Sequence, residues 1–303
     1  MRIAKFKSSY LRPSACICGF IILFCGCHHN HAVKEPYVGE TQPMYDVVKE
    51  INRNNARLPT LWASIDKMEI SFLDEKQKRH DESLHGSLLY RSPRDVKLNG
   101  AADVVGNVLE IGSNRDNYWL IARKPGPDQA WWGRYKYLGD PRSKPIPVSP
   151  ALVLEVLGVS TINEDFNALP VPVMRFNNDS DAYMFIWNTK LPDRWVATKE
   201  IWYDRTTKRP TKVFLFDANG RIILSARLDK HKPVQVPDLD KSQWPVVATD
   251  YRLNFPDNGS YMHLVLDEVR LKRNNVPNDV TFRFSPDKLD VSTVTQLDED
   301  CGP

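Results

Sequence analysis

The sequence has few cysteines, and nearly all of them lie near its start. Four of the five, Cys16, Cys18, Cys25 and Cys27, fall within the first 27 residues, and the fifth is Cys301. A single cysteine beyond this leader excludes an internal disulfide framework and a cysteine-based metal site. Glycine is scarce as well, with 14 residues against 22 prolines. This balance indicates many short, rigidly turned connections, as β proteins have.

The sequence also lacks the common motifs of catalysis and nucleotide binding. It contains no His-Glu-x-x-His, no Gly-x-Ser-x-Gly, no phosphate-binding loop and no Gly-x-Gly-x-x-Gly. The cluster His28-His29-Asn30-His31 is expected to be solvated linker, with weak binding of a transition metal as the alternative. We therefore expect no enzyme, no cofactor and no metal site. A carboxylate pair that forms only in the folded chain is the alternative that a motif search does not detect.

Positive charge is in excess only within the first 26 residues. Arg2, Lys5, Lys7 and Arg12 occur there without an acidic residue. Without these four, the chain has 37 Lys+Arg (41 less 4) against 38 Asp+Glu, a net charge of −1. The rest of the chain therefore has no excess of basic residues that would favour binding to nucleic acid.

The same leader has the layout of an export signal. An apolar run from Ala15 to Phe24 follows the basic residues, and it is far shorter than the ~20 residues that cross a bilayer as a helix. The small Gly26 comes next, as at the cleavage site of a signal peptide. Because Cys27 follows directly, the segment resembles a bacterial lipoprotein signal, which implies that Cys27 becomes the lipidated first residue, with acyl chains such as palmitate. An ordinary cleaved signal and an uncleaved anchor are the alternatives.

Beyond this signal peptide, residues 1–26, the sequence predicts a tether and one domain. Residues 27–43 show no apolar periodicity and are expected to form a flexible link from the lipidated Cys27. The domain is expected over 44–296, because no linker or repeat divides it, and a C-terminal tail over 297–303.

The domain is predicted to begin with an amphipathic helix over Met44–Leu58. Its apolar stripe recurs near a 3.6-residue period and comprises Val47, Val48, Ile51 and Leu58. Pro59 disfavours helical geometry in the residue before it, so the helix should end there. Thr60 is expected to cap a final short turn that carries Trp62.

From Ile65 onward the apolar period changes from 3.6 to two, which is typical of strands. A second helix is predicted over Ala151–Leu157, where Pro150 precedes and Gly158 follows. This order predicts a mostly β, α+β domain of about a dozen antiparallel strands. The predicted strands are Ile65–Leu73, Leu84–Tyr90, Asp95–Asn99, Val104–Ile111, Tyr118–Arg123, Ala130–Tyr137, Val171–Phe176, Tyr183–Asn188, Val196–Tyr203, Lys212–Phe216, Ile222–Leu228, Val246–Asn254, His263–Val269 and Thr281–Phe284.

Two stretches within these strands are apolar on both faces. They are Tyr118–Ile121 and Tyr183–Trp187, and a strand of this kind needs cover on both sides. The first helix is expected to cover one side, and further helix, loop or ligand the other. For most of the individual aromatic residues, simple packing in a core is the alternative.

Several short stretches occur in an order that is typical of one known family. They are Leu61–Ile65, Leu88–Pro93, Asp95–Leu98, Gly112–Asn114, Tyr118–Leu120, Tyr251–Asn254 and Phe282–Pro286. The chain in this respect resembles the LolA-like periplasmic lipoprotein carriers and their LolB-type outer-membrane relatives, over about Tyr45–Val294. The resemblance implies a single curved antiparallel sheet, a half-barrel, whose concave face is covered by helices and holds acyl chains.

The resemblance also implies two functional features. In the carriers an Arg beside a Pro hydrogen-bonds the helical lid and gates the cavity, and the nearest match here is Arg91, with Ser92 inserted before Pro93. That insertion turns Arg91 to the other face if the register is kept, because strand side chains alternate. LolB-type proteins have an apolar loop directed toward the membrane, and its counterpart here is Ala101–Val105.

The wall of the hollow is predicted from the two strands that are apolar on both faces. Aromatic rings are favoured there because they offer a large apolar area at low entropic cost. The favoured ligand-binding residues are Trp119, Ile121, Phe185 and Trp187, with Trp62 and Arg91 as further candidates. The alternatives on the same two strands are Tyr118 with Leu120, and Met184 with Ile186.

Together these observations predict a lipid-anchored protein on the periplasmic face of the outer membrane of a diderm bacterium. Its domain is expected to bind a lipid, or the acyl chains of a lipid-modified protein, as a carrier or acceptor. The alternative is a non-enzymatic interaction or envelope-sensor module of the same fold, with the hollow filled by its own side chains.

Overall fold

The computed structural model describes residues 35–73, 78–123, 128–138, 140, 142–144, 150–271 and 277–302. The described residues from Pro36 onward form one compact unit. The predicted signal peptide, Cys27 and the histidine cluster lie outside the described residues, so lipidation stays a prediction. Within the described ranges, no helix has both the length and the apolar character that a membrane span requires.

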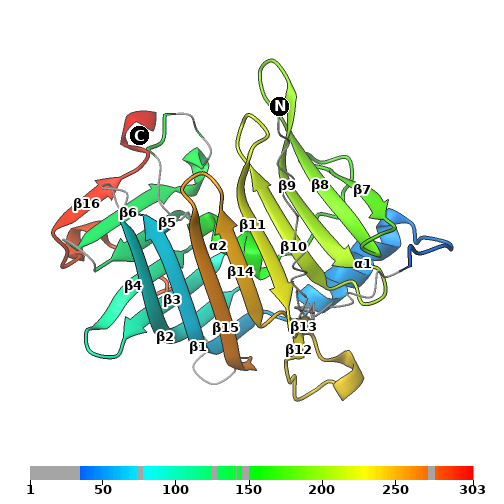
Figure 1. The fold of residues 1–303 in the computed structure, drawn as a ribbon, viewed down its shortest axis with the longest axis horizontal. Helices are drawn as coiled ribbons and strands as arrows, with labels where there is room; N and C mark the ends of the chain where they lie inside the picture. The colour runs from blue at the N-terminus through cyan, green and yellow to red at the C-terminus, as the bar shows by residue number, and fades with distance from the viewer. Residues whose placement is uncertain are drawn as a thin grey trace, which may run out of the picture. The chain divides into compact units, whose positions relative to one another are not determined.

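Most of the described strands join one curved sheet that does not close into a barrel (Figure 1). From one edge to the other, its 14 strands within the described ranges are β16 (Thr293–Gln296), β6 (Gln129–Arg134), β5 (Asn117–Ala122), β4 (Gly106–Ser113), β3 (Asp95–Ala102), β2 (Arg79–Arg91), β1 (Thr60–Leu73), β15 (Ser260–Arg270), β14 (Asp250–Phe255), β11 (Ile222–Asp229), β10 (Pro210–Phe216), β9 (Trp195–Asp204), β8 (Ala182–Lys190) and β7 (Pro172–Asn177). A separate pair joins β12 (Lys232–Pro233) to β13 (Val246–Val247).

Neighbouring strands of the large sheet run antiparallel, with one exception. At one edge, β16 runs parallel to β6, with Val294 beside Ala130. The predicted mostly β class is therefore confirmed, and so is one large open sheet, which is antiparallel except at this edge. The parallel edge strand is a feature that the sequence did not predict, and the predicted strand Thr281–Phe284 is instead a turn and an irregular segment.

The first strand begins earlier than predicted. Thr60 pairs with Arg91 of β2, so β1 already includes Leu61 and Trp62. The predicted helical turn at these residues is wrong. Leu61, Ala63 and Ile65 are buried while the residues between them are half-buried, so the two-residue period of a strand starts at Leu61.

Helix α1 (Met44–Asn55) is amphipathic, as predicted, but ends three residues before Leu58. The buried residues of the predicted stripe, Val47, Val48 and Ile51 on the helix and Leu58 after it, belong to one hydrophobic core with strand residues. The backbone N–H of Ala56 closes the last turn on the carbonyl of Asn52. Asparagine is a poor helix former, so Asn54 and Asn55 favour an end at this point.

Helix α2 (Pro150–Leu157) contacts strands that are far apart in the sheet. Val153, Leu154, Val156 and Leu157 are buried, and the helix touches β4 and β5 as well as β10. Gly158 ends it with φ +67°, a conformation that favours glycine. A Cβ atom at this position would lie 2.7 Å from Cγ of Pro210, so glycine is also required by the close approach of β10.

Two hydrophobic cores lie on opposite faces of the strands near β5. The main core contains α1, α2 and most strands, including Leu120 of β5. A second core contains Trp119, Ile121 and Ala130, and Phe284, Leu289 and Val291 pack against it from the C-terminal segment. This segment, residues 277–302, contains short 3-10 turns at Pro286–Lys288 and Glu299–Cys301. The other 3-10 turns are Tyr135–Tyr137 and Lys241–Gln243.

The ends of the described chain pack on the domain. Residues 36–42, which belong to the predicted tether, lie against β7 and β8. The ring of Tyr37 is 5.7 Å from that of Phe176, and the backbone N–H of Gln42 donates to the hydroxyl of Tyr183 at 2.8 Å. At the other end, Asp298 of the predicted tail has no exposed surface. The limits of the predicted segments otherwise stay predictions.

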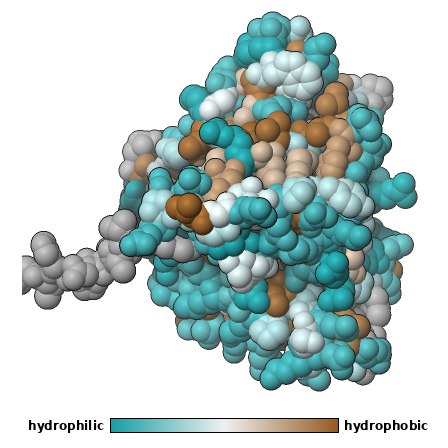
Figure 2. Space-filling view, turned by 90° about the vertical axis from the view of Figure 1, so that its right-hand side faces the viewer, coloured by the Kyte–Doolittle hydropathy of each residue, from teal (hydrophilic) through white to brown (hydrophobic). Residues whose placement is uncertain are grey.

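The sheet ends at β7, and exposed hydrophobic residues gather near this edge. Figure 2 views the molecule from this side and shows a band of hydrophobic side chains set among hydrophilic ones. Leu169 precedes β7, Val173 lies on it, and Trp195 begins β9; each has more than half of its surface exposed, at 68%, 52% and 55%. Exposed apolar side chains next to an open strand edge favour contact with a partner.

Candidate functional site

The structure separates the four residues that were predicted to share one wall. Phe185 and Trp187 belong to the main core, but Trp119 and Ile121 belong to the second core on the other face of the sheet. On this first strand, the alternative residue Leu120 lies in the main core. The prediction of a common wall is therefore wrong for Trp119 and Ile121. A strand that is apolar on both faces has no pattern that tells which face is inside.

Trp119 has the contacts of a packed structural residue. Its indole stacks on the ring of Phe284 with the centroids 4.8 Å apart, and its Nε1 donates to Oε1 of Glu110 at 2.9 Å. Gly112 on β4 leaves the space that the indole fills, because a Cβ there would lie 2.1 Å from the ring. Trp119 therefore fills the second core and does not belong to the main core, which contains α2.

Trp62 also lies away from the main core. It is half-buried, whereas its neighbours Leu61 and Ala63 are buried in the main core. Alternation along a strand therefore places Trp62 on the opposite face. There the guanidinium carbon of Arg270 lies 4.1 Å from the ring centroid, a cation–π contact across the β1–β15 pair.

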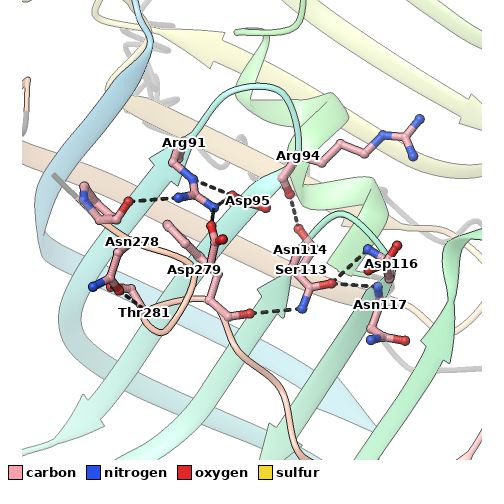
Figure 3. Close-up of polar contacts among 12 residues, drawn as sticks. Arg91, Arg94, Asp95, Ser113, Asn114, Asp116, Asn117, Asn278, Asp279 and Thr281 are labelled. Carbon is pink, nitrogen blue, oxygen red and sulfur yellow. Dashed lines mark hydrogen bonds and ion pairs between the residues drawn. The ribbon is translucent and has the colours of Figure 1, made fainter.

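Arg91, at the end of β2, contacts the C-terminal segment. Its Nε donates to Oδ2 of Asp95 at 2.6 Å, its Nη1 to the carbonyl of Pro277 at 3.0 Å, and its Nη2 to Oδ1 of Asp279 at 2.8 Å (Figure 3). Its guanidinium carbon lies 5.1 Å from the ring centroid of Phe282. These contacts fit a residue that fastens this segment to the sheet, and the implied role in gating a helix stays a prediction.

The main core around Phe185 and Trp187 is aromatic. The Phe185 ring lies 5.6 Å from that of Tyr203 in an edge-to-face arrangement and 6.1 Å from that of Trp187. The Tyr203 hydroxyl is protonated at neutral pH, as a tyrosine ordinarily is, and burial raises its pKa further. The core face of β8 and β9 thus offers rings and one protonated hydroxyl.

A small pocket opens beside these rings, at the C-terminal end of α2. Its volume is about 20 Å³, roughly the space of one water molecule. The lining comes from α2, from the segment after it and from β8 and β9, and comprises Glu155, Gly158, Ser160, Thr161, Ile162, Trp187, Lys199, Ile201 and Tyr203.

One ion pair spans this pocket. Nζ of Lys199 on β9 lies 2.7 Å from Oε2 of Glu155 on α2, with 21% and 34% of the two side chains exposed. The same Nζ lies 4.4 Å from the ring centroid of Trp187. Lys199 is therefore a cation on the core-facing side of the sheet, and α2 supplies its negatively charged partner.

Three asparagines at the end of α1 fix that helix in place, a function that the sequence analysis missed. Asn52 exchanges hydrogen bonds with the backbone of Ile162, and Asn54 exchanges them with the backbone of Val246, with distances of 2.8–3.1 Å. Asn55 donates to the carbonyl of Ser160 at 2.8 Å. Three asparagines within four residues were the available signal in the sequence, since asparagine is uncommon inside helices unless its side chain forms a specific hydrogen bond.

No family model matches the sequence, and no curated protein matches it. Solved structures that resemble the chain include a LolA superfamily protein from Nitrosomonas europaea, with 12% identity, a TM-score of 0.48 and coverage of 79% of this chain and 96% of that one. Another is a putative outer membrane lipoprotein-sorting protein domain from Vibrio parahaemolyticus, with 15% identity, a TM-score of 0.43 and coverage of 79% and 98%.

A third is a DUF1329 family protein from Desulfovibrio piger, with 12% identity, a TM-score of 0.43 and coverage of 80% and 98%. LolA-like proteins, the family that the sequence resembles, are thus among the solved structures that resemble the chain. With TM-scores below 0.5 and identities of 12–15%, these likenesses carry no argument about function, which is argued from the chain itself.

Proposed function

We propose that the domain binds an acyl chain, of a lipid or of a lipid-modified protein, on the core face of its sheet in the space that α2 fills. The observation that carries this proposal is α2 itself. It places four buried aliphatic side chains between β10 and the pair β4 and β5. Eight helical residues span ~12 Å. An apolar chain bound in their place would gain about 0.8 kcal/mol of binding free energy for each methylene group that it buries.

The two helices differ in how they are attached, and this difference supports α2 as the element that moves. Three asparagines on α1 bond to the backbone of other segments. By contrast, the sequence of α2, Pro-Ala-Leu-Val-Leu-Glu-Val-Leu, has one polar side chain, and that side chain makes the ion pair with Lys199. Ligand pockets have volumes of roughly 300–1,000 Å³, far above the pocket beside α2, so binding requires α2 to leave its place.

The cellular role follows from this binding site together with the predicted leader. We place the protein on the periplasmic face of the outer membrane, attached through acyl chains on Cys27 and a tether, where it acts as a carrier or acceptor and not as an enzyme. The helices then cover the concave face of the half-barrel. Phe185 and Trp187 contact the ligand, because they belong to the main core. Trp119, Ile121 and Trp62 do not, because they lie outside this core.

The proposal is tested with a fluorescent fatty-acid probe and a matched pair of tryptophan variants. Trp187 faces the main core, whereas Trp202 on the adjacent strand β9 lies half-buried between core residues Ile201 and Tyr203, hence on the opposite face. We expect Trp187→Ala to weaken probe binding and Trp202→Ala to leave it unchanged. Absence of probe binding by the wild type, with no lipid detected by native mass spectrometry of protein purified from membranes, would refute the proposal.

A second candidate is an interaction module whose hollow is permanently filled by its own side chains. The open edge at β7, with exposed Leu169 and Val173, favours this reading. An extended segment of a partner protein could add to such an edge as a further strand. In this case the purified protein should be free of lipid, and Val173→Lys should abolish partner capture in cross-linking without any effect on thermal stability.

A further inference from the structure

We infer that the bound amphiphile carries an anionic head group and that Lys199 binds this head group. The inference rests on the proposed function and adds the chemical class of the ligand to it. A lysine on the core-facing side of a sheet is unusual, because burial of an ammonium group is costly unless a partner neutralises it. In the closed state the partner is Glu155, 2.7 Å away.

The partner of Lys199 belongs to the element that must move. When α2 leaves its place, Glu155 leaves with it, and the ammonium group of Lys199 remains at the rim of an apolar surface. Breaking a partly buried ion pair in this way is unfavourable. An acyl chain with a carboxylate or phosphate head group compensates for this cost, because its chain replaces α2 and its charge replaces Glu155. A neutral amphiphile replaces the apolar contacts of α2 but not the negative charge of Glu155.

The surroundings of Lys199 suit a negative charge. Trp187 lies against its ammonium group, at 4.4 Å from the ring centroid, which restricts where Nζ is presented. Tyr203 lines the same pocket, and its hydroxyl, protonated at neutral pH, is a second donor. Ser160 and Thr161 line it as well and add hydroxyl groups. A site with one cation and several donors beside an apolar wall matches a head group that accepts hydrogen bonds.

The test compares two probes of the same chain length, a dansyl-labelled undecanoic acid and its methyl ester, on the full chain. We expect Lys199→Met to weaken binding of the acid about tenfold or more, the scale of a charge-assisted hydrogen bond, and to leave binding of the ester within twofold. Glu155→Gln removes the competing carboxylate, so it should strengthen binding of the acid. Lys199→Arg should restore most of the affinity that Lys199→Met loses.

A matched control is available on the other face of the sheet. Nζ of Lys212 lies 4.2 Å from the ring centroid of Trp202, the same kind of contact that Lys199 makes with Trp187. Lys212→Met should leave the binding of both probes unchanged. Displacement of the acid probe by dodecanoate or by dodecyl phosphate then shows whether the site prefers a carboxylate or a phosphate head group.

The outcomes separate this inference from the proposed function. If the wild type binds the acid and the ester, and Lys199→Met weakens both or neither, the head-group role of Lys199 is wrong while acyl binding stands. If the wild type binds neither probe and carries no lipid in native mass spectrometry, the proposed function fails, and the inference fails with it. Thermal melting of Lys199→Met, expected within a few degrees of the wild type, guards against a change in folding.

Discussion

Arg134 on β6 and Asp298 after β16 form an ion pair that fastens the end of the chain to the sheet. Nε of Arg134 lies 2.8 Å from Oδ2 of Asp298, and the backbone N–H of Arg134 donates to the same oxygen at 3.0 Å. Nη2 of Arg134 also donates to the carbonyl of Gly302 at 2.8 Å. Because Asp298 is completely buried, its charge depends on these partners.

Loss of Arg134 should therefore destabilise the domain strongly. Arg134→Met leaves a buried carboxylate without its cation, a change that costs about 3–5 kcal/mol. The control is Arg142→Met, because the pair of Arg142 with Asp140 is largely exposed on the arginine side, at 59%, and such pairs contribute under about 1 kcal/mol. Urea unfolding measures the stability of both variants. Equal free energies of unfolding would show that the pair of Arg134 with Asp298 stabilises the domain no more than the exposed pair does.

The same pair predicts how stability depends on pH. Burial alone would raise the pKa of Asp298, but hydrogen bonds from Arg134 and Gln296 hold that pKa below its ordinary value. The pKa of Asp298 is thus lower in the folded protein than in the unfolded chain. The ionised carboxylate therefore makes its full contribution to the free energy of unfolding above the unfolded pKa of about 3.9, and this contribution is lost as the pH falls through the pKa of the folded protein.

We therefore expect the free energy of unfolding of the wild type to decline between pH 4 and pH 2 more steeply than that of Asp298→Asn, which has no carboxylate to titrate. Chemical unfolding at a series of pH values measures the two slopes. Parallel curves for the two proteins in this range would contradict the assigned direction of the pKa shift.

Trp119 should behave as a structural residue and not as a ligand contact. Trp119→Ala removes an indole that is stacked on Phe284 and almost fully buried, and changes of this kind cost about 3–5 kcal/mol. At a temperature where the variant is still folded, its affinity for the fatty-acid probe should equal that of the wild type. A loss of probe affinity with little loss of stability would show that Trp119 is a ligand contact after all.

The contrast between Trp119 and Trp187 illustrates what the sequence could predict. Most strand positions, the amphipathic stripe of α1 and the short apolar α2 follow from local signals and were predicted to within about five residues. The predicted strand Thr281–Phe284 was wrong, and β16 was not predicted. The face to which each residue of Tyr118–Ile121 belongs depends on the register of distant strands, and a stretch that is apolar throughout carries no signal of it.

The C-terminal segment was the least predictable part. Val294 lies beside Ala130 in the parallel edge pair, and Phe284 covers Trp119, contacts between residues more than 160 positions apart in sequence. A parallel partner so distant in sequence leaves no turn motif from which to infer the pairing. Likewise, the ion pair of Lys199 with Glu155 joins β9 to α2 across 44 residues, and no motif marks either residue.

The buried stripe of α1 gives a prediction for the helix. Ile51→Asp places a carboxylate among residues of the main core, where Ile51 has only 2% of its surface exposed. Burial of an unpaired charge should cost several kcal/mol. Arg53→Asp changes a residue of the same helix that is exposed and should cost less than 1 kcal/mol. Thermal melting compares them, and similar melting temperatures would mean that α1 is dispensable for the stability of the sheet.

The lipid anchor gives the last prediction. A basic leader, a short apolar run and a small residue before Cys27 predict cleavage before Cys27 and acylation of it. Metabolic labelling with a fatty-acid probe should mark the wild type and miss Cys27→Ser, whereas Cys25→Ser should label like the wild type, because the bulky Phe24 makes Cys25 a poor acceptor. Several acyl chains hold a protein at a membrane stably, while one holds it only marginally. Cys27→Ser, when exported, should therefore appear in the soluble periplasmic fraction. Equal labelling and equal membrane retention of all three proteins would exclude an anchor at Cys27 and favour the uncleaved leader.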